Sequence, residues 1–205
     1  AANIEDLGAE RNSPTIYYRD PNRSAPTNMI LNSAPLMAKA KNLVSAKNMG
    51  WQFGKKPAGG QVISAVRISW PNANYGARWS ESQSRWLLSH NNSADLSASG
   101  TQLGSPTLVI QLVKISASIY GDKFGGVTPM SETVGTGPGY VLRDSEVFRG
   151  TWNRTSAETG TTWLLEDGSE LPFTPGQIWI ALTDQEPIFT YLTPKSPSAS
   201  PATTK

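Results

Sequence analysis

The chain has 205 residues, with 18 Lys and Arg against 16 Asp and Glu, so its formal net charge is only +2. A protein that binds nucleic acid by neutralising phosphates needs a surplus of Lys and Arg, so this balance argues against that class. The absence of Cys and the single His, His90, exclude disulfides, thiolate nucleophiles and most His- or Cys-based metal sites. No apolar stretch approaches the length of a transmembrane helix, and no leader of the secretory type is visible.

The two ends of the chain differ in composition from its middle. Residues 1–13 are polar and aperiodic, which indicates an irregular entry segment. Residues 193–205 are rich in Ser, Pro and Thr, so they cannot bury enough apolar area to fold and are predicted to be a disordered tail. The sequence therefore predicts one folded domain over residues 14–192.

The first elements are two short extended runs and a helix. The runs cover residues 15–18 and 27–31. Beyond them, Ser33 offers an N-cap, and the spacing of the following apolar residues is typical of one helix face. These are Leu36, Ala40, Leu43 and Val44. The pattern predicts a helix over residues 33–47, the only convincing helix in the chain.

From residue 62 onward the pattern changes to short strands separated by Gly- and Asp-containing turns. In residues 62–70 the alternation predicts that Val62, Val66 and Ile68 share one face with Trp70. The most apolar run, 107–120, is expected to be a central strand buried on both faces, and the Gly-rich stretch 121–138 to be irregular. Further strands are expected at 76–79, 85–89, 140–142, 146–154, 161–165 and 177–182.

Together these elements predict an α+β fold, namely a mainly antiparallel β-sheet domain with the principal helix of residues 33–47 packed on it.

Two stretches of the chain form a specific succession of residues. The first is Tyr18-Arg19-Asp20-x-x-Arg23-x-Ala25-Pro26-x-Asn28-Met29, followed by the expected helix. The second comprises Arg143-Asp144, Gly150-Thr151-Trp152-x-Arg154, Glu166-Asp167-Gly168 and Pro175-Gly176-Gln177-Ile178-Trp179-Ile180. In order and spacing, over residues 17–182, the two stretches resemble the C-terminal part of the YerB-like family. Its members are described as bacterial lipoproteins and contain a domain of unknown function.

The resemblance implies a location outside the cytoplasm, with the full-length protein anchored to the membrane or secreted. It also implies a further region N-terminal to this segment. Relatives carry a His where this chain has Thr27, and an aromatic-x-Arg where it has Trp86-Leu87-Leu88. The first functional hypothesis is a binding module of the cell envelope for a glycan or a peptidoglycan-related ligand. The alternatives are an envelope hydrolase that uses carboxylates in a loop-lined cleft, and a scaffold that binds a protein through a sheet edge.

Arg19, Asp20 and Arg23, with Asn28 close by, form the first candidate ligand site. Two guanidinium groups could present a bidentate site for a carboxylate or phosphate. The alternative is structural, because Asp-Pro-Asn is a ready-made turn in which Asp20 would cap the backbone and pair with one Arg. The structural interpretation is favoured.

Trp152 and Arg154 form the second candidate, as an aromatic plate with a hydrogen-bond donor two residues away on the same strand face. Sugars are held in this way, by stacking on a ring while fixed polar groups take their hydroxyls. Alternatively, Trp152 is a core residue that pairs across the sheet. The two interpretations differ in whether the ring is exposed.

The remaining motifs give weaker indications of function. Gly135–Gly139 lacks the Lys-Ser/Thr and the helix of a phosphate loop, so nucleotide binding by this run is rejected. We expect it either to approach the sheet closely or to form a mobile lip of a cleft. His90, the one candidate base for nucleophilic catalysis, lies in a polar turn, and the sequence contains no nucleophile elbow.

Many carboxylates could pair as in a glycosidase, among them Glu81, Glu132, Asp144, Glu146, Glu158, Glu166, Asp167 and Glu170. No pair stands out, so no catalytic residue, metal site or cofactor is assigned, and the oligomeric state stays open.

Overall fold

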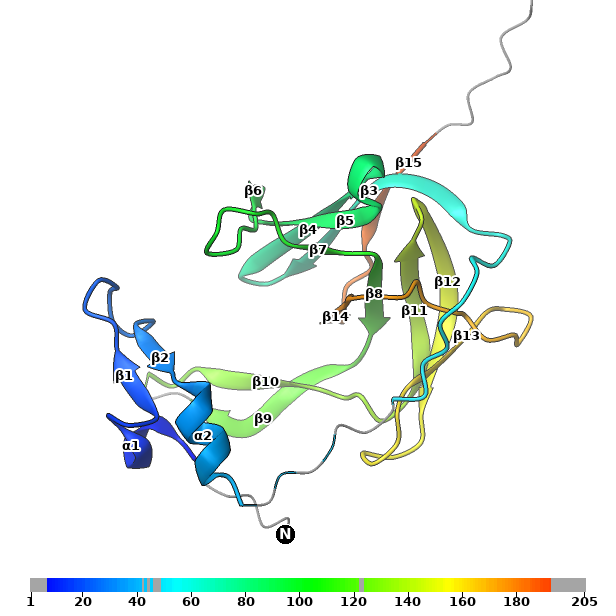
Figure 1. Ribbon diagram of the computed structural model, residues 1–205. Coiled ribbons are helices and arrows are strands. Elements are labelled where there is room, and N and C mark those ends of the chain that lie inside the picture. Colours follow the sequence, from blue (N-terminus) through cyan, green and yellow to red (C-terminus); the bar gives the residue numbers. More distant parts are fainter. Residues whose placement is uncertain (1–6, 42, 44, 46–48, 122–123, 193–205) are drawn as a thin grey trace, which may run out of the picture. The chain divides into compact units, whose positions relative to one another are not determined.

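The computed structural model describes residues 7–41, 43, 45, 49–121 and 124–192. The expected tail, residues 193–205, and residues 1–6 of the entry segment therefore lie outside the described residues. Contacts along the chain group into two compact units, Ala1–Lys47 and Asn48–Lys205, where the sequence predicted one domain. Figure 1 shows the elements of both units.

The smaller unit contains two short helices and a two-stranded antiparallel sheet. These elements are α1 (Ala9–Asn12), β1 (Tyr17–Arg19), β2 (Met29–Leu31) and α2 (Ser33–Lys39). Ile16, only 2% exposed, is its buried apolar residue. Asn12 ties the helices together, because its Nδ2 donates to the Gly8 carbonyl and its Oδ1 accepts from Lys39 Nζ.

The expected helix over residues 33–47 is wrong in length, because α2 ends at Lys39 and Ala40 is extended. Leu43 is non-helical and 59% exposed, and Val44 lies outside the described residues. No residue of α2 is buried. Since short helices depend on a packed apolar face, the predicted stripe has nothing to stabilise a longer helix.

The larger unit is a curled, mainly antiparallel sheet with the strand order β14-β8-β11-β12-β3-β4-β5-β6. Among the described strands, β14 and β8 are the one pair that runs parallel. The path is formed by β3 (Gln61–Trp70), β4 (Ala73–Ser80), β5 (Arg85–His90), β6 (Ser93–Ala94), β8 (Thr107–Leu112), β11 (Gly135–Arg143), β12 (Glu146–Arg154) and β14 (Ile178–Thr183). β7 (Gly104–Ser105), β13 (Thr162–Leu164) and β15 (Ile188–Tyr191) pair with β5, β12 and β3, and the 3-10 helix η1 (Glu81–Gln83) joins β4 to β5. The β-rich fold class is confirmed.

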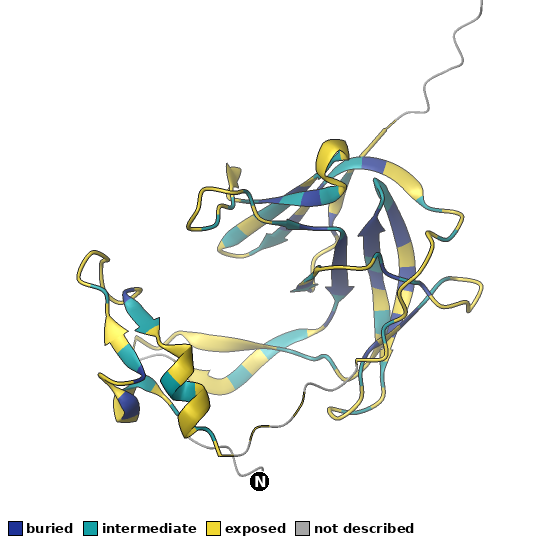
Figure 2. Cartoon of the chain, viewed as in Figure 1, coloured by how far each residue is buried: buried dark blue, intermediate teal, exposed yellow. Residues whose placement is uncertain are grey.

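Strands β8, β11 and β12 have a buried core on each face. On one face, Leu108, Ile110 and Leu142 pack with residues of β3 to β5 such as Ile68 and Trp86. On the other face lies a second core, made of Val109, Val113, Val141, Phe148, Trp152, Trp163, Leu171 and Phe173. In Figure 2 dark blue, which marks buried residues, is prominent on these three strands. Burial on both faces explains the continuous apolar run in β8.

The predicted strand over residues 107–120 is two strands. β8 ends at Leu112, and the chain then forms β9 (Ile115–Gly121), which pairs with β10 (Val127–Ser131) in a separate two-stranded sheet. The break marks a change of partner, because pairing with β14 ends where the Val113 amide donates to the Thr183 carbonyl, and β9 then pairs with β10. The stretch 121–138, expected to be irregular, contains β10 and the start of β11.

In β3 the predicted face changes phase near its start. Ile63 is fully buried while Val62 is 45% exposed, although Val66 and Ile68 are buried as expected. The register with β15 shifts there, since Thr190 pairs with Ala65 and Tyr191 with Ile63. One additional residue on β3 reverses the alternation, as a β-bulge does.

The glycines of β11 make room for two indole rings. A Cβ on Gly137 would lie 2.9 Å from Nε1 of Trp152, and one on Gly139 would lie 2.7 Å from the six-membered ring of Trp163. Both glycines therefore serve a close approach within the sheet, and the alternative of a mobile lip does not apply to them.

Candidate functional site

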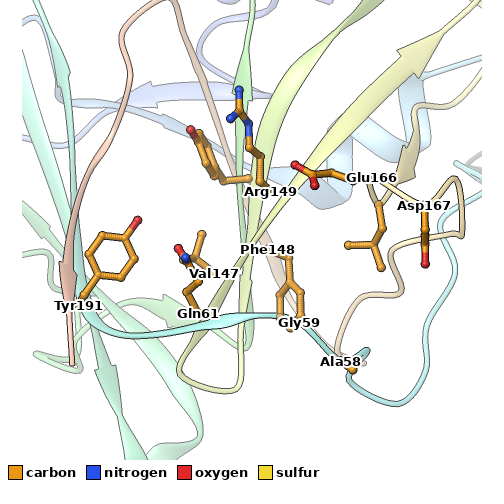
Figure 3. A pocket seen from close by; sticks show the side chains of 11 residues that line it. Ala58, Gly59, Gln61, Val147, Phe148, Arg149, Glu166, Asp167 and Tyr191 are labelled. Atoms are coloured by element: carbon orange, nitrogen blue, oxygen red, sulfur yellow. The ribbon is translucent and has the colours of Figure 1, made fainter. Parts of the chain in front are cut away.

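A groove of about 560 Å³ opens beside the middle of β12 (Figure 3). It is lined by Ala58, Gly59, Gln61, Tyr140, Val147, Phe148, Arg149, Leu165, Glu166, Asp167 and Tyr191. β12 pairs with β3 through Glu146 and Val147, and with β13 through Thr151–Asn153. Between these two pairings the strand lacks a partner on this side in the described sheet, and the gap places Phe148 and Arg149 at the groove.

The segment before β3 forms one wall and lies directly on Phe148. A Cβ on Gly60 would be 2.5 Å from the Phe148 ring, so no larger residue fits without displacing it. Gly59 has φ +90°, a conformation that L side chains rarely adopt. An ion pair between Lys56 and Glu146 ties the same segment to the start of β12. The local sequence Ala58-Gly59-Gly60 therefore fixes the position of Gln61 at the rim.

An aromatic series forms the opposite side. The rings of Tyr140 and Phe189 meet edge to face with centroids 5.0 Å apart, and Phe189 meets Tyr191 at 6.0 Å. The Tyr140 hydroxyl donates to Glu186 Oε2 at 2.8 Å. Partial burial, together with this hydrogen bond, raises the pKa of Tyr140 to about 12, so it stays neutral at ordinary pH. Tyr191, 54% exposed, presents its ring to the groove.

The polar groups of the groove are mostly uncommitted. Within the described chain, the side chains of Gln61, Arg149 and Glu166 have no hydrogen-bond or ion-pair partner. In Figure 3 the Glu166 carboxylate points toward Arg149, whereas Asp167 points away from it. An amide, a guanidinium and a carboxylate thus face the same space from three different segments. They could together bind a polar ligand through donors and acceptors.

The carboxylates give less support to hydrolysis. Asp167 is fully exposed and accepts from the Ser169 amide and hydroxyl, which lowers its pKa, whereas a general acid needs a raised one. Four other candidates are engaged elsewhere: Glu146 pairs with Lys56, Glu132 with Lys114, Asp144 with Arg143, and Glu81 accepts from Trp79. His90 stacks on Tyr75, with ring centroids 4.8 Å apart.

Arg19, Asp20, Arg23 and Asn28 do come together, in the smaller unit. Arg19 Nη1 donates to Asn28 Oδ1 at 2.6 Å, and Asn28 Nδ2 donates to the Asp20 carbonyl at 3.3 Å. Asp20 accepts from the Asn22 amide and pairs with Arg23 at 3.3 Å. These contacts make the turn between β1 and β2 self-contained, which is the structural alternative considered from the sequence.

Trp152 lies in the core, and the prediction of an exposed plate is corrected. Its ring is 3% exposed, and its Nε1 donates to the Leu112 carbonyl at 2.9 Å. Arg154 is on the same strand face, but its guanidinium donates to the Ala157 and Thr159 carbonyls and to Thr133 Oγ1. The reason is the pairing with Trp163 on β13, which closes this face over the glycines of β11.

The motif Arg143-Asp144 is also structural. Arg143 is 3% exposed and donates to the Pro172 and Gly54 carbonyls and to Asp144. Asp144 and Ser145 have φ of +50° and +61° and close the turn between β11 and β12. The guanidinium therefore holds together the segments that cover the second core.

Sequence reasoning did not single out Gln61, Arg149 or Tyr191. Arg149 alternates with the buried Phe148 and Gly150, so an isolated charge on an otherwise core-forming strand was a usable signal. Tyr191 belongs to β15, a strand that the sequence analysis did not predict. Its run of β-branched and aromatic residues, Ile188-Phe189-Thr190-Tyr191, was the available indication.

The fold and the groove define a class, a β-rich domain with a curled mixed sheet and an open polar recess. A family model described as the C-terminal domain of a protein of unknown function (DUF3048) matches residues 66–180, and the chain belongs to this family. The match lies in the larger unit. The expected YerB-like relationship is confirmed.

A similar solved structure is that of the YerB protein from Bacillus subtilis, with a TM-score of 0.64 and 17% sequence identity. The match covers 84% of this chain and 58% of the YerB chain, so this chain spans little more than half of that protein. At this identity the likeness concerns the fold. No curated protein matches the chain.

Two further observations concern the described residues alone. None of their helices has the length and apolar character needed to cross a membrane. Nor do three or more of their His, Asp and Glu side chains gather where they could hold a metal ion.

Proposed function

We propose that this domain is a non-catalytic binding module of the bacterial cell envelope and that its groove takes a glycan or a peptidoglycan-related ligand. The observation that carries the proposal is the groove's lining. The half-exposed ring of Tyr191 lies at a recess where Gln61, Arg149 and Glu166 are not engaged with one another. The envelope location rests on the resemblance to YerB-like proteins.

The chemistry of a sugar fits this lining. A pyranose has apolar C–H faces that stack on an aromatic ring and equatorial hydroxyls that both donate and accept hydrogen bonds. Tyr191 supplies the ring, Glu166 accepts, Arg149 donates, and Gln61 does both. Because these groups are hydrated when the groove is empty, each new bond replaces one to water and contributes modestly. Affinity for a short oligosaccharide is therefore expected on the order of millimolar to micromolar.

The test uses chitotetraose as the probe, monitored by calorimetry or NMR titration on the whole chain. Tyr191→Ala should abolish binding and leave the melting temperature unchanged. Tyr120→Ala is the matched control, since Tyr120 is 70% exposed and does not line the groove. Equal loss of binding in both variants, or no binding by the unmodified chain to chitotetraose or to soluble peptidoglycan fragments, would overturn the proposal.

The same titration separates binding from hydrolysis. The oligosaccharide is recovered after long incubation and its length determined by mass spectrometry. Intact chitotetraose supports a binding module. Shortened products that disappear in Glu166→Gln, but persist in Tyr191→Ala, would replace the proposal with an envelope hydrolase.

A further inference from the structure

A second recess, here called the pocket, lies on the face of the sheet that carries Trp152. Its volume is about 320 Å³, within the range of small-molecule sites. Its walls are mainly apolar and come from β8 and β14, through Val109, Ile180 and Leu182, and from Phe173. None of these residues lines the groove, so the two recesses are separate.

Two buried hydrogen-bond donors at the pocket have no partner. Gln111, on β8, is 5% exposed, and its Nε2 has no acceptor in the described chain. The same holds for the indole Nε1 of Trp51. An unpaired buried donor costs on the order of 1–3 kcal/mol, so such groups are normally satisfied by protein, water or ligand.

The fold does satisfy comparable groups nearby. Nε1 of Trp152 donates to the Leu112 carbonyl and Nε1 of Trp70 to the Leu182 carbonyl, both at 2.9 Å. Three other buried polar atoms lack a partner, on Arg85, Trp86 and Thr174, but none of these residues lines the pocket. Within the described chain, Gln111 and Trp51 are therefore the two lining residues of the pocket that carry a buried, unpaired donor.

The chain is built to hold Trp51 at this place. A Cβ on Gly160 would lie 1.8 Å from the Met49 carbonyl oxygen, so the segment that leads to Trp51 passes against Gly160. The Gly54 amide donates to the Phe173 carbonyl, and the Phe173 amide donates to the Gln52 carbonyl. The rings of Trp51 and Phe173 are in contact, with centroids 5.6 Å apart. Trp51 is thus held in place by the contact of Met49 with Gly160 before it in the chain and by the hydrogen bonds of Gln52 and Gly54 with Phe173 after it.

The charge of the pocket's lining indicates which ligand group accepts these hydrogen bonds. Arg154 is the one charged residue among the described residues that line the pocket. Its guanidinium makes three hydrogen bonds to protein oxygens, which leaves two of its five N–H groups without a protein acceptor. A carboxylate gains from the positive charge, whereas an ammonium group is repelled by it.

We infer that the pocket binds a small, mainly aliphatic carboxylate, with its chain against Val109, Ile180 and Leu182 and its carboxylate accepting from Gln111 Nε2 and Trp51 Nε1. This site is independent of the groove and of the glycan assigned to it. The buried donors favour a carboxylate as the ligand's head group, and the apolar walls favour an aliphatic chain as its tail.

Octanoate is the probe, titrated into the ¹⁵N-labelled whole chain. The side-chain amide of Gln111 and the indole N–H of Trp51 should shift downfield together as their protons gain an acceptor. Octylammonium, which has the same tail and the opposite charge, should leave both signals in place. Failure of octanoate to shift them, or equal shifts with octylammonium, would overturn the inference.

Two variants make the test specific. Gln111→Leu should weaken octanoate binding by about tenfold, the equivalent of one charge-assisted hydrogen bond. Ile180→Trp places a large ring in the pocket from a position that is 40% exposed, and should abolish binding while the chain stays folded. Ile188→Trp is its control, since Ile188 is 57% exposed and does not line the pocket. Octanoate affinity that survives Ile180→Trp would contradict the assignment.

Discussion

The groove and the pocket of the larger unit differ in how their polar groups are satisfied when empty. In the groove, Arg149 and Glu166 are exposed to solvent. In the pocket, the donors of Gln111 and Trp51 are buried. A ligand in the groove must compete with water for every hydrogen bond, whereas a ligand in the pocket restores bonds that folding left unmade. The groove therefore suits a polar ligand held weakly at many points, and the pocket an apolar one held at few.

The largest expected effect tests whether Trp152, on the sheet face that carries the pocket, is part of the core. Trp152→Ala should lower the free energy of unfolding by about 3–5 kcal/mol, because a buried indole is lost and a cavity remains. Urea denaturation measures this change. Tyr191→Ala, on the groove side, should change the stability by less than about 0.5 kcal/mol. Similar small losses in both variants would show that Trp152 is not a core residue.

The next prediction uses a substitution that adds one methyl group and should affect the pocket but not the groove. Gly139→Ala brings a Cβ to 2.6 Å from the Ile110 carbonyl oxygen and 2.7 Å from the Trp163 ring, and Trp163 lines the pocket. Overpacking of this kind costs about 1–3 kcal/mol. Octanoate binding should weaken while chitotetraose binding is kept. Gly54→Ala is the control, because its Cβ would make only an ordinary contact of 3.7 Å with Pro172.

A charge in the groove should matter for ligand and not for stability. Arg149→Ala removes an exposed guanidinium without a protein partner among the described residues, so unfolding should change by less than about 0.5 kcal/mol. Chitotetraose affinity should fall several-fold in a calorimetric titration. Arg78→Ala, at an exposed position on β4, provides the comparison. A large loss of stability in Arg149→Ala would show that the groove's polar groups are structural braces.

The smallest effect concerns pH at the groove's aromatic side. The pKa of Tyr140 is raised from 10.0 to about 12, so the folded state holds this proton more tightly than the unfolded chain does. The resulting stabilisation is fully present below about pH 10 and is lost as the pH rises toward about 12. Ultraviolet difference titration should show that Tyr140 titrates late, and Glu186→Gln should move its pKa toward the ordinary value. Glu158→Gln, exposed and distant in sequence, should leave it unchanged.

Strands whose signals are local could be predicted from the sequence. The bounds of β12, Glu146–Arg154, agree with the prediction because its alternation is regular and the Asp144-Ser145 turn precedes it. The face of Val62 and the single strand over residues 107–120 were wrong for a common reason. A bulge opposite β15 and a break opposite β14 are set by partner strands distant in the chain, so no local pattern reports them.

The candidate site could be predicted less well than the fold. Gln61, Arg149 and Tyr191 come from β3, β12 and β15, which meet only through sheet pairing. Trp152 is of a residue type that often contacts ligands. Whether its ring is exposed depends on its pairing with Trp163 and on Gly137 and Gly139, which leave room for the two rings. Residue type alone distinguishes a core tryptophan from a stacking plate poorly, because both uses require a large apolar ring.

The most direct test of the groove as the binding site is shift mapping of the ¹⁵N-labelled chain with chitotetraose and octanoate in successive titrations. Chitotetraose should move the signals of Gln61, Arg149, Glu166 and Tyr191 and leave the Trp51 indole N–H in place. Octanoate should then move the Trp51 and Gln111 side-chain signals and leave those of the groove. A sugar that moves no groove signal, or that moves the Arg19, Asp20 and Arg23 turn instead, would contradict the account.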